Sequence, residues 1–188
     1  PKVRQAIAYG FNYDAFIKDM LRGKAKQARG PIPSNFVGFN PNVPQYHYDP
    51  AKAKQLLAEA GHPNGGFTIK YTYETGYWWK RPLGELFQSN MKDLGINVEI
   101  QELSASAWAG LLSNPETADH AFGLVWWPTL ASPYDYMWSI FATGAQGSAP
   151  LTVTAADEEL SGTGADTLAT AALAFAFLIA GAGAVMFA

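Results

Sequence analysis

Two dense clusters of aromatic side chains are the groups in this sequence best suited to hold a ligand. The first is Tyr77-Trp78-Trp79, and the second lies within residues 122–141, where five of the residues from Trp126 to Trp138 are Trp or Tyr. Aromatic faces offer a large apolar area and a preferred stacking geometry. The same rings also fill hydrophobic cores. The sequence therefore leaves two interpretations open: the clusters pack in the core, or they form a ligand-binding surface.

Each cluster follows a segment that is predicted to be a strand. Residues 67–73 alternate apolar and polar side chains, and residues 121–127 form a short apolar run that ends before Pro128. If the two strands are parallel, both clusters lie outside the carboxyl end of the sheet, where ligands bind in open α/β sheets. The predicted ligand-binding residues are Tyr77, Trp78, Trp79, Trp126, Trp127, Thr129, Leu130 and Tyr134.

Groups for catalysis or metal binding are sparse. Glu74 and Asp135 can be read as the carboxylate pair of a glycoside-acting enzyme, but Asp135 also fits as a helix cap. The three histidines, at positions 47, 62 and 120, lack metal-ligand spacing. The chain has no cysteine, which excludes thiol catalysis and disulfides. We therefore predict no catalytic residue, no metal and no cofactor.

The composition favours a globular domain with an uneven distribution of charge. Of the 188 residues, 48% are hydrophobic and 15% charged, which is enough to bury one core. Residues 1–92 carry 13 basic and 6 acidic side chains, whereas residues 93–188 carry 10 acidic side chains and none that is basic. The basic residues are dispersed, apart from a cluster between Arg22 and Arg29, so no nucleic-acid partner is predicted.

The secondary-structure signals indicate an α/β fold. Asp49, Pro50 and Gly61 are the cap, first residue and stop signal of a helix. A second helix is predicted over residues 12–21, with Asn12 as its cap, and residues 24–47 read as a long loop. The strand at residues 67–73, a helix over residues 82–94 and a strand at residues 96–100 form a βαβ unit, which requires parallel strands. Ser104 or Ser106 is expected to cap a short helix that ends at Leu112.

The character of the chain changes near Thr143. Residues 144–164 are small, polar and acidic, and predict a flexible linker. From Leu168 to Ala188 no charge occurs, and a helix of that length would span about 31 Å, close to the bilayer core of about 30 Å. A membrane or surface anchor and a buried helix or artefact of truncation both fit residues 165–188. The chain begins with Pro1 inside a helical pattern, which favours a fragment or a processed chain.

The order of these motifs resembles the second lobe of the extracytoplasmic solute-binding proteins that serve peptide- and nickel-type ABC importers, family 5. The resemblance extends from Val3 to about Ala142. Its motifs are Val3-Arg4-Gln5-Ala6-Ile7-Ala8-Tyr9 with Asn12-Tyr13-Asp14, Gly30-Pro31-Ile32-Pro33, the helix from Tyr48 to Gly61, Leu94-Gly95-Ile96-Asn97-Val98-Glu99-Ile100, and Trp127 with Pro133-Tyr134-Asp135-Tyr136.

The resemblance implies one lobe of a type II periplasmic-binding-protein-like fold, in residues 1–143. It further implies an extracytoplasmic, non-catalytic protein that captures an oligopeptide, a sugar or a related small solute. The implied partners are the membrane subunits of an ABC importer and the first lobe, which this sequence lacks. Peptide-binding members have an aspartate that anchors the ligand amino group where this chain has Leu130, a departure that favours a less charged ligand.

Two other functions stay open on the sequence. A membrane-tethered interaction module would use the acidic linker and the apolar tail from Leu168 to Ala188. A glycoside-acting enzyme would use Glu74 or Asp135, and loss of turnover on replacing either carboxylate would identify it.

Overall fold

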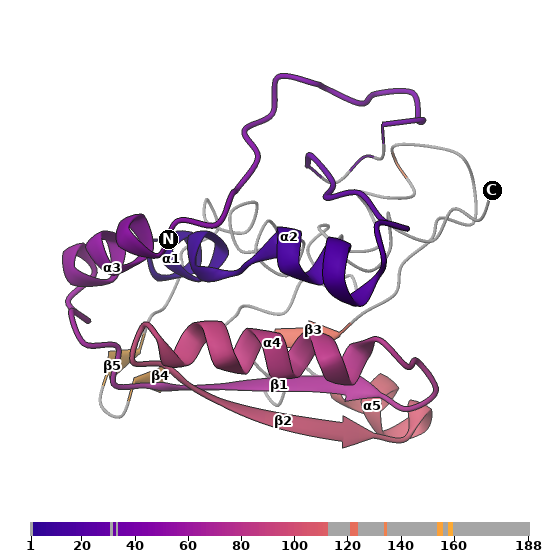
Figure 1. Cartoon of the computed structure of the whole chain (residues 1–188). Coiled ribbons are helices and arrows are strands. Elements are labelled where there is room, and N and C mark those ends of the chain that lie inside the picture. The colour runs from indigo at the N-terminus through magenta and orange to yellow at the C-terminus, as the bar shows by residue number, and fades with distance from the viewer. Residues whose placement is uncertain are drawn as a thin grey trace.

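A parallel sheet of three strands, in the order β2-β1-β3, forms the base of the computed structural model (Figure 1). The strands are β1 (Thr68–Glu74), β2 (Asn97–Leu103) and β3 (Ala121–Gly123). The structure describes residues 2–30, 32, 34–112, 121–123, 134, 154–155 and 158–159. Only the first three residues of the strand predicted at residues 121–127 therefore lie in the described part.

The βαβ unit is present as predicted, with shifted boundaries. Helix α4 (Lys80–Lys92) connects β1 to β2, which run parallel with Tyr71 opposite Ile100. The helix begins two residues before the predicted start and ends at Lys92 rather than residue 94, and β1 lies one residue later than the predicted strand. Gly84 allows α4 to approach the sheet closely, because a Cβ there would lie 2.6 Å from the ring of Tyr71.

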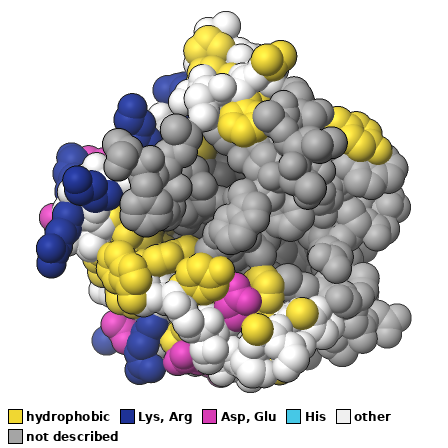
Figure 2. Space-filling model, turned by 90° about the vertical axis from the view of Figure 1, so that its right-hand side faces the viewer, with side chains coloured by type: hydrophobic (Ala, Val, Ile, Leu, Met, Phe, Trp, Pro, Cys, Tyr) yellow, Lys and Arg dark blue, Asp and Glu magenta, His cyan; other side chains and the backbone are white. Residues whose placement is uncertain are grey.

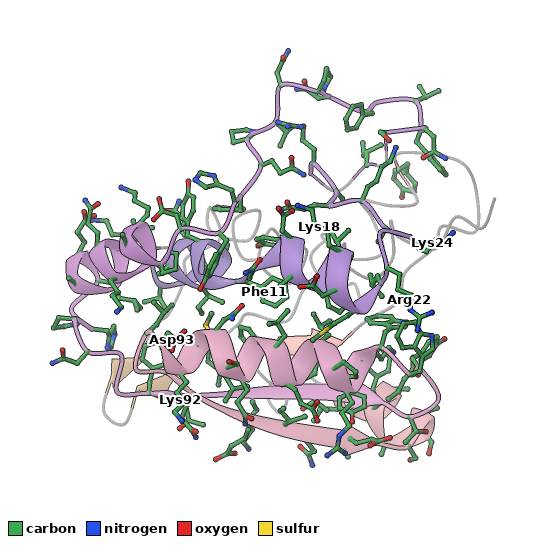
Figure 3. The ribbon with its side chains drawn as sticks, viewed as in Figure 1. Phe11, Lys18, Arg22, Lys24, Lys92 and Asp93 are labelled. Carbon is green, nitrogen blue, oxygen red and sulfur yellow. The ribbon has the colours of Figure 1, made fainter. Side chains whose placement is uncertain are left out.

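A second layer of helices covers the face of α4 that is turned away from the sheet (Figure 1). It consists of α1 (Lys2–Gly10), α2 (Tyr13–Ala15) and η1 (Phe16–Met20), together with α3 (Pro50–Glu59), which packs on α1. Phe11 points from this layer toward α4 (Figure 3), and its ring centroid lies 6.4 Å from that of Phe87. This contact joins the helical layer to the sheet layer in one hydrophobic core.

The helix predicted over residues 12–21 has the expected cap but not the expected form. The Asn12 side chain accepts a hydrogen bond from the Ala15 N–H at 3.0 Å. After Ala15 the chain widens into a π-helix, in which the Leu21 N–H donates to the Phe16 oxygen at 3.0 Å. Phe16 is fully buried between the rings of Phe11 and Trp79, so we attribute the extra residue in this turn to the packing of that ring.

The helix predicted between Asp49 and Gly61 is confirmed in its caps. The Asp49 carboxylate accepts a hydrogen bond from the Lys52 N–H at 2.9 Å, and Pro50 is the first helical residue. Gly61 has a φ of 88°, the left-handed conformation that ends many helices. The Asp49 N–H also donates to the Tyr9 oxygen at 2.8 Å, which ties the start of α3 to α1.

The remaining segments fall partly outside the described residues. The loop at residues 24–47 has neither helix nor strand in its described part, as predicted. Helix α5 (Ala105–Leu112) follows β2, and Ser104 caps it by accepting from the Ala107 N–H at 3.3 Å. Two short antiparallel strands, β4 (Thr154–Ala155) and β5 (Glu158–Glu159), lie within the predicted linker. The apolar tail from Leu168 to Ala188 lies outside the described residues, among which no helix is long and apolar enough to cross a membrane.

Candidate functional site

The carboxyl ends of the three parallel strands meet at one edge of the sheet, which we call the carboxyl edge. β1 ends there at Glu74 and β2 at Leu103, and β3 pairs with β1 through Gly123 and Tyr73. The Thr75 N–H donates to the Leu103 oxygen at 2.9 Å, which holds the loop after β1 against the end of β2. The first predicted aromatic cluster therefore lies at this edge, and the second follows β3 in the sequence.

A buried ion pair spans the loop between β1 and α4. The Lys80 Nζ lies 2.8 Å from Glu74 Oε1, and the side chain of Lys80 is 0% exposed against 18% for that of Glu74. Burial lowers the pKa of Lys80, and the hydrogen bond and charge of Glu74 oppose this shift. The pair thus joins the last residue of a strand to the first residue of the following helix.

Three aromatic rings enclose the ammonium group of Lys80. Its Nζ lies 4.0 Å from the centroid of the Tyr77 ring, 5.8 Å from that of Trp79 and 5.4 Å from that of Trp108. Ring faces attract a cation, and the attraction grows when water is excluded. We call the Glu74–Lys80 pair together with these three rings the lysine box.

Two tyrosines of β1 donate hydrogen bonds near the carboxyl end of the sheet, and that of Tyr71 reaches the backbone of Lys80 in the lysine box. The Tyr71 hydroxyl donates to the backbone oxygen of Lys80 at 2.9 Å, and the Tyr73 hydroxyl donates to Glu102 Oε2 at 2.9 Å. Burial raises the pKa of Tyr71, and burial and the bond to Glu102 raise the pKa of Tyr73. Both hydroxyls are therefore held in the protonated form that donates these bonds.

The predicted ligand-binding residues differ in their placement. Trp78 is 71% exposed and Tyr134 is 65% exposed, so both rings are open to solvent. Trp79 is only 6% exposed and belongs to the core, and Tyr77 is half-buried over Lys80, so core packing accounts for these two rings. The other four predicted residues, Trp126, Trp127, Thr129 and Leu130, lie outside the described part of the chain.

Sequence reasoning missed Lys80 and Trp108. It gave Lys80 no role, and it did not single out Trp108 on the short helix. The sequence did carry one signal for Lys80. The Tyr-Trp-Trp triplet is flanked by a carboxylate at Glu74 and an ammonium at Lys80, which can form an ion pair. Trp108 carried no such signal, because its approach depends on where α5 packs.

Figure 2 shows the molecule from the side of the carboxyl edge, with hydrophobic and acidic side chains in its lower half, which contains the sheet and α4. Among the described residues, no group of three histidine, cysteine or acidic side chains is arranged to hold a metal ion. Glu74, one of the two carboxylates considered for catalysis, is engaged with Lys80, and Asp135 lies outside the described residues. At the carboxyl edge, the structure offers the exposed ring of Trp78 next to a buried ion pair.

The fold is a parallel α/β lobe with aromatic side chains at its carboxyl edge, and comparison with known proteins identifies its family. The model of the family "Bacterial extracellular solute-binding proteins, family 5 Middle" matches residues 1–148. The chain belongs to this family.

Individual relatives agree with the family. The chain is 31% identical over 150 residues to the glutathione-binding protein GsiB of Pectobacterium atrosepticum, covering 80% of this chain and 29% of that protein. It is 37% identical over 122 residues to heme-binding protein A of Haemophilus influenzae, covering 64% of this chain and 20% of the relative. The chain thus spans less than a third of the length of either protein.

Solved structures show the same lobe. HbpA2 from Haemophilus parasuis matches with a TM-score of 0.69 and 27% identity over 79% of this chain and 29% of that structure. The periplasmic binding protein DppA from Helicobacter pylori, in complex with the peptide STSA, matches with a TM-score of 0.66 and 26% identity over 93% of this chain and 35% of its own. These matches confirm the type II periplasmic-binding-protein-like α/β fold predicted for the lobe.

Proposed function

We propose that this chain forms one wall of a solute-binding cleft in an extracytoplasmic protein that serves an ABC importer. Its role is reversible, non-covalent capture of an oligopeptide, a sugar or a related small solute, without catalysis. The observation that carries the proposal is Trp78, 71% exposed at the carboxyl edge of a family 5 lobe. An exposed indole at that edge has an apolar face to offer to a ligand.

The proposed ligand-binding residues are Trp78 and Tyr134 with, from outside the described part, Trp126, Trp127, Thr129 and Leu130. Tyr77 and Trp79 lie on the protein side of this surface and support it. Leu130 stands where the resemblance implies a charged anchor, so the proposed solute is not held by its amino group. Relatives named for glutathione, heme and dipeptides show how diverse the solutes of this family are.

The proposed partners follow from the same membership. A first lobe would close the cleft over the solute by a hinge motion, and the closed form would dock on the membrane subunits of the importer. We place the protein outside the cytoplasm. Membrane contact through the segment from Leu168 to Ala188 remains a separate proposal, which predicts that the protein needs detergent for solubility and that deletion of this segment removes the need.

Titration calorimetry on the chain tests the proposed capture. The solutes are a tripeptide, glutathione, a disaccharide and heme, and the variant is Trp78→Ala. The matched control is Val37→Ala, which removes another exposed apolar side chain (82% exposed) from the loop at residues 24–47. We expect at least one solute to bind, Trp78→Ala to weaken that binding, and Val37→Ala to leave it unchanged. Equal affinities of Trp78→Ala and the unaltered chain, or no binding of any of the four solutes, would overturn the proposal.

A further inference from the structure

The loop after β1 combines one exposed ring with two rings that are held in place. Five residues, 75–79, separate the strand end Glu74 from the helix start Lys80. Tyr77 and Trp79 turn toward Lys80 and lie 6.2 Å apart at their centroids, in an edge-to-face arrangement. Trp78 lies between them in the sequence and is 71% exposed. The orientation of Trp78 is thus set by where its two neighbours pack.

The contacts of the two neighbours converge on one charged group. The ammonium of Lys80 is the shared partner of both rings, and the carboxylate of Glu74 holds it at 2.8 Å. Trp79 also contacts the core through the ring of Phe16, at 6.5 Å between centroids. Backbone bonds alone do not fix the rings: Lys80 N–H donates to the Tyr77 oxygen at 3.2 Å, which closes a turn but leaves the side chains free to rotate.

The same ammonium joins a second element to the loop. Among the described side chains of α5, that of Trp108 is buried, and the residue is 7% exposed. Its ring centroid lies 5.4 Å from the Lys80 Nζ. The lysine box therefore fastens three segments at the carboxyl edge: the end of β1, the aromatic loop and α5. The ammonium group of Lys80, paired with Glu74, lies at the point where they meet.

We propose that the Glu74–Lys80 ion pair, enclosed by Tyr77, Trp79 and Trp108, is the device that turns Trp78 outward at the carboxyl edge. Lys80 is on this view a positioning residue for the solute-binding surface, acting through the rings without touching the solute. The proposal rests on the proposed function only for the role of Trp78 in binding a solute. The outward orientation itself follows from contacts within the chain.

Fluorine NMR on protein labelled with 5-fluorotryptophan tests the proposal without any solute. Each of the relevant resonances is assigned with a Trp→Phe variant, and a soluble gadolinium chelate reports how far each ring is open to water. In the unaltered protein we expect strong relaxation of Trp78 and protection of Trp79 and Trp108. In Lys80→Met, Trp79 and Trp108 are expected to lose protection and Trp78 to relax less, because the shared partner of the rings is gone.

Two further variants separate positioning from a loss of folding. Lys80→Arg keeps a cation that can pair with Glu74 and stack on the rings, so it should protect Trp79 and Trp108 better than Lys80→Met does. Lys92→Met removes an exposed lysine at the far end of the same helix (Figure 3) and should change nothing. If Lys80→Met fails to fold, Glu74→Gln puts the same question to the other member of the pair.

The outcomes distinguish this proposal from the proposed function. A pattern in Lys80→Met or Glu74→Gln that is identical to that of the unaltered protein overturns the positioning role, whatever binds. The expected pattern combined with no effect of Trp78→Ala on any solute keeps the positioning role and overturns the proposed use of Trp78.

Discussion

The two ends of β1 are closed by different kinds of contact. At the amino end, backbone meets backbone: the Gly66 N–H donates to the Gly95 oxygen and the Asn97 N–H to the Phe67 oxygen, both at 3.0 Å. A Cβ on Gly95 would overlap the oxygen of Asn64, so no side chain fits there. At the carboxyl end, the lysine box closes the strand with side chains from β1, the loop after it, α4 and α5, beside one backbone bond from the Thr75 N–H to the Leu103 oxygen.

This difference shows where the lobe is fixed and where it can vary. A contact between backbone groups depends on the glycines and excludes both side chains and ligands. A contact between side chains can be retuned by substitution while the sheet stays in place. If the proposed solute-binding surface lies at the carboxyl edge, its side chains can change while the sheet stays in place.

The strongest test of the amino end is Gly95→Ala. Gly95 has a φ of 76°, and the added methyl would meet the Asn64 backbone. We expect a loss of about 1–2 kcal/mol in the free energy of unfolding from the left-handed backbone, and of about 1–3 kcal/mol more from the overlap. Urea unfolding measures both together.

Gly66→Ala is the matched control for that substitution. Gly66 has a similar φ of 81°, but nothing lies within 4 Å of the position of its Cβ. Its cost should be confined to about 1–2 kcal/mol of backbone strain. If the two variants lost equal amounts of unfolding free energy, the contact between the Gly95 and Asn64 backbones would not be what fixes the amino end of β1.

The carboxyl end is tested by Lys80→Met, with the next largest effect. The substitution keeps the length of the side chain but leaves the carboxylate of Glu74 without its cation. We expect the free energy of unfolding to fall by about 1–3 kcal/mol, against less than about 0.5 kcal/mol for the exposed Lys92→Met. If both variants unfold at the same urea concentration, the lysine box contributes no stability and the contrast between the ends fails.

The two ends also differ in how far sequence alone could predict them. Local sequence signals predict the caps of α3 and the βαβ unit that contains Gly95. Asp49, Pro50 and Gly61 were each placed correctly. The burial of Lys80 was not predicted, because a charged residue is ordinarily exposed and its partners come from β1, the loop and α5. The π-helix at Phe16 was missed for a similar reason, since its extra residue depends on a ring packed from a distant segment.

A smaller effect is expected from Tyr71→Phe, which removes the hydroxyl that holds Lys80 from the sheet. At neutral pH the lost bond to the Lys80 oxygen should cost about 0.5–1.5 kcal/mol. Burial raises the pKa of Tyr71, so its stabilising contribution is complete below the ordinary tyrosine pKa of about 10 and is lost as pH rises above it. Above that pH the advantage of the unaltered protein over the variant should shrink by about 1.4 kcal/mol per pH unit.

Urea unfolding at a series of pH values measures this loss. Tyr48→Phe is the control, because Tyr48 is 39% exposed. A constant difference between the unaltered protein and Tyr71→Phe across the alkaline range would show that the Tyr71 hydroxyl ionises as readily in the folded chain as in the unfolded one. Such a result would mean that the Tyr71 hydroxyl is not shielded from water in the way that its burial indicates.

The smallest change in stability is expected where the proposed change in function is largest. Trp78→Ala removes a ring that is 71% exposed, so the free energy of unfolding should change by less than about 0.5 kcal/mol, while solute binding weakens. Trp79→Ala, one residue along, removes a core ring and should unfold at a clearly lower urea concentration. Measuring unfolding and binding on the same two samples separates the surface from its support. If Trp78→Ala proved as destabilising as Trp79→Ala, the indole of Trp78 would be part of the closure of β1, and the carboxyl end would be as fully committed to structure as the amino end.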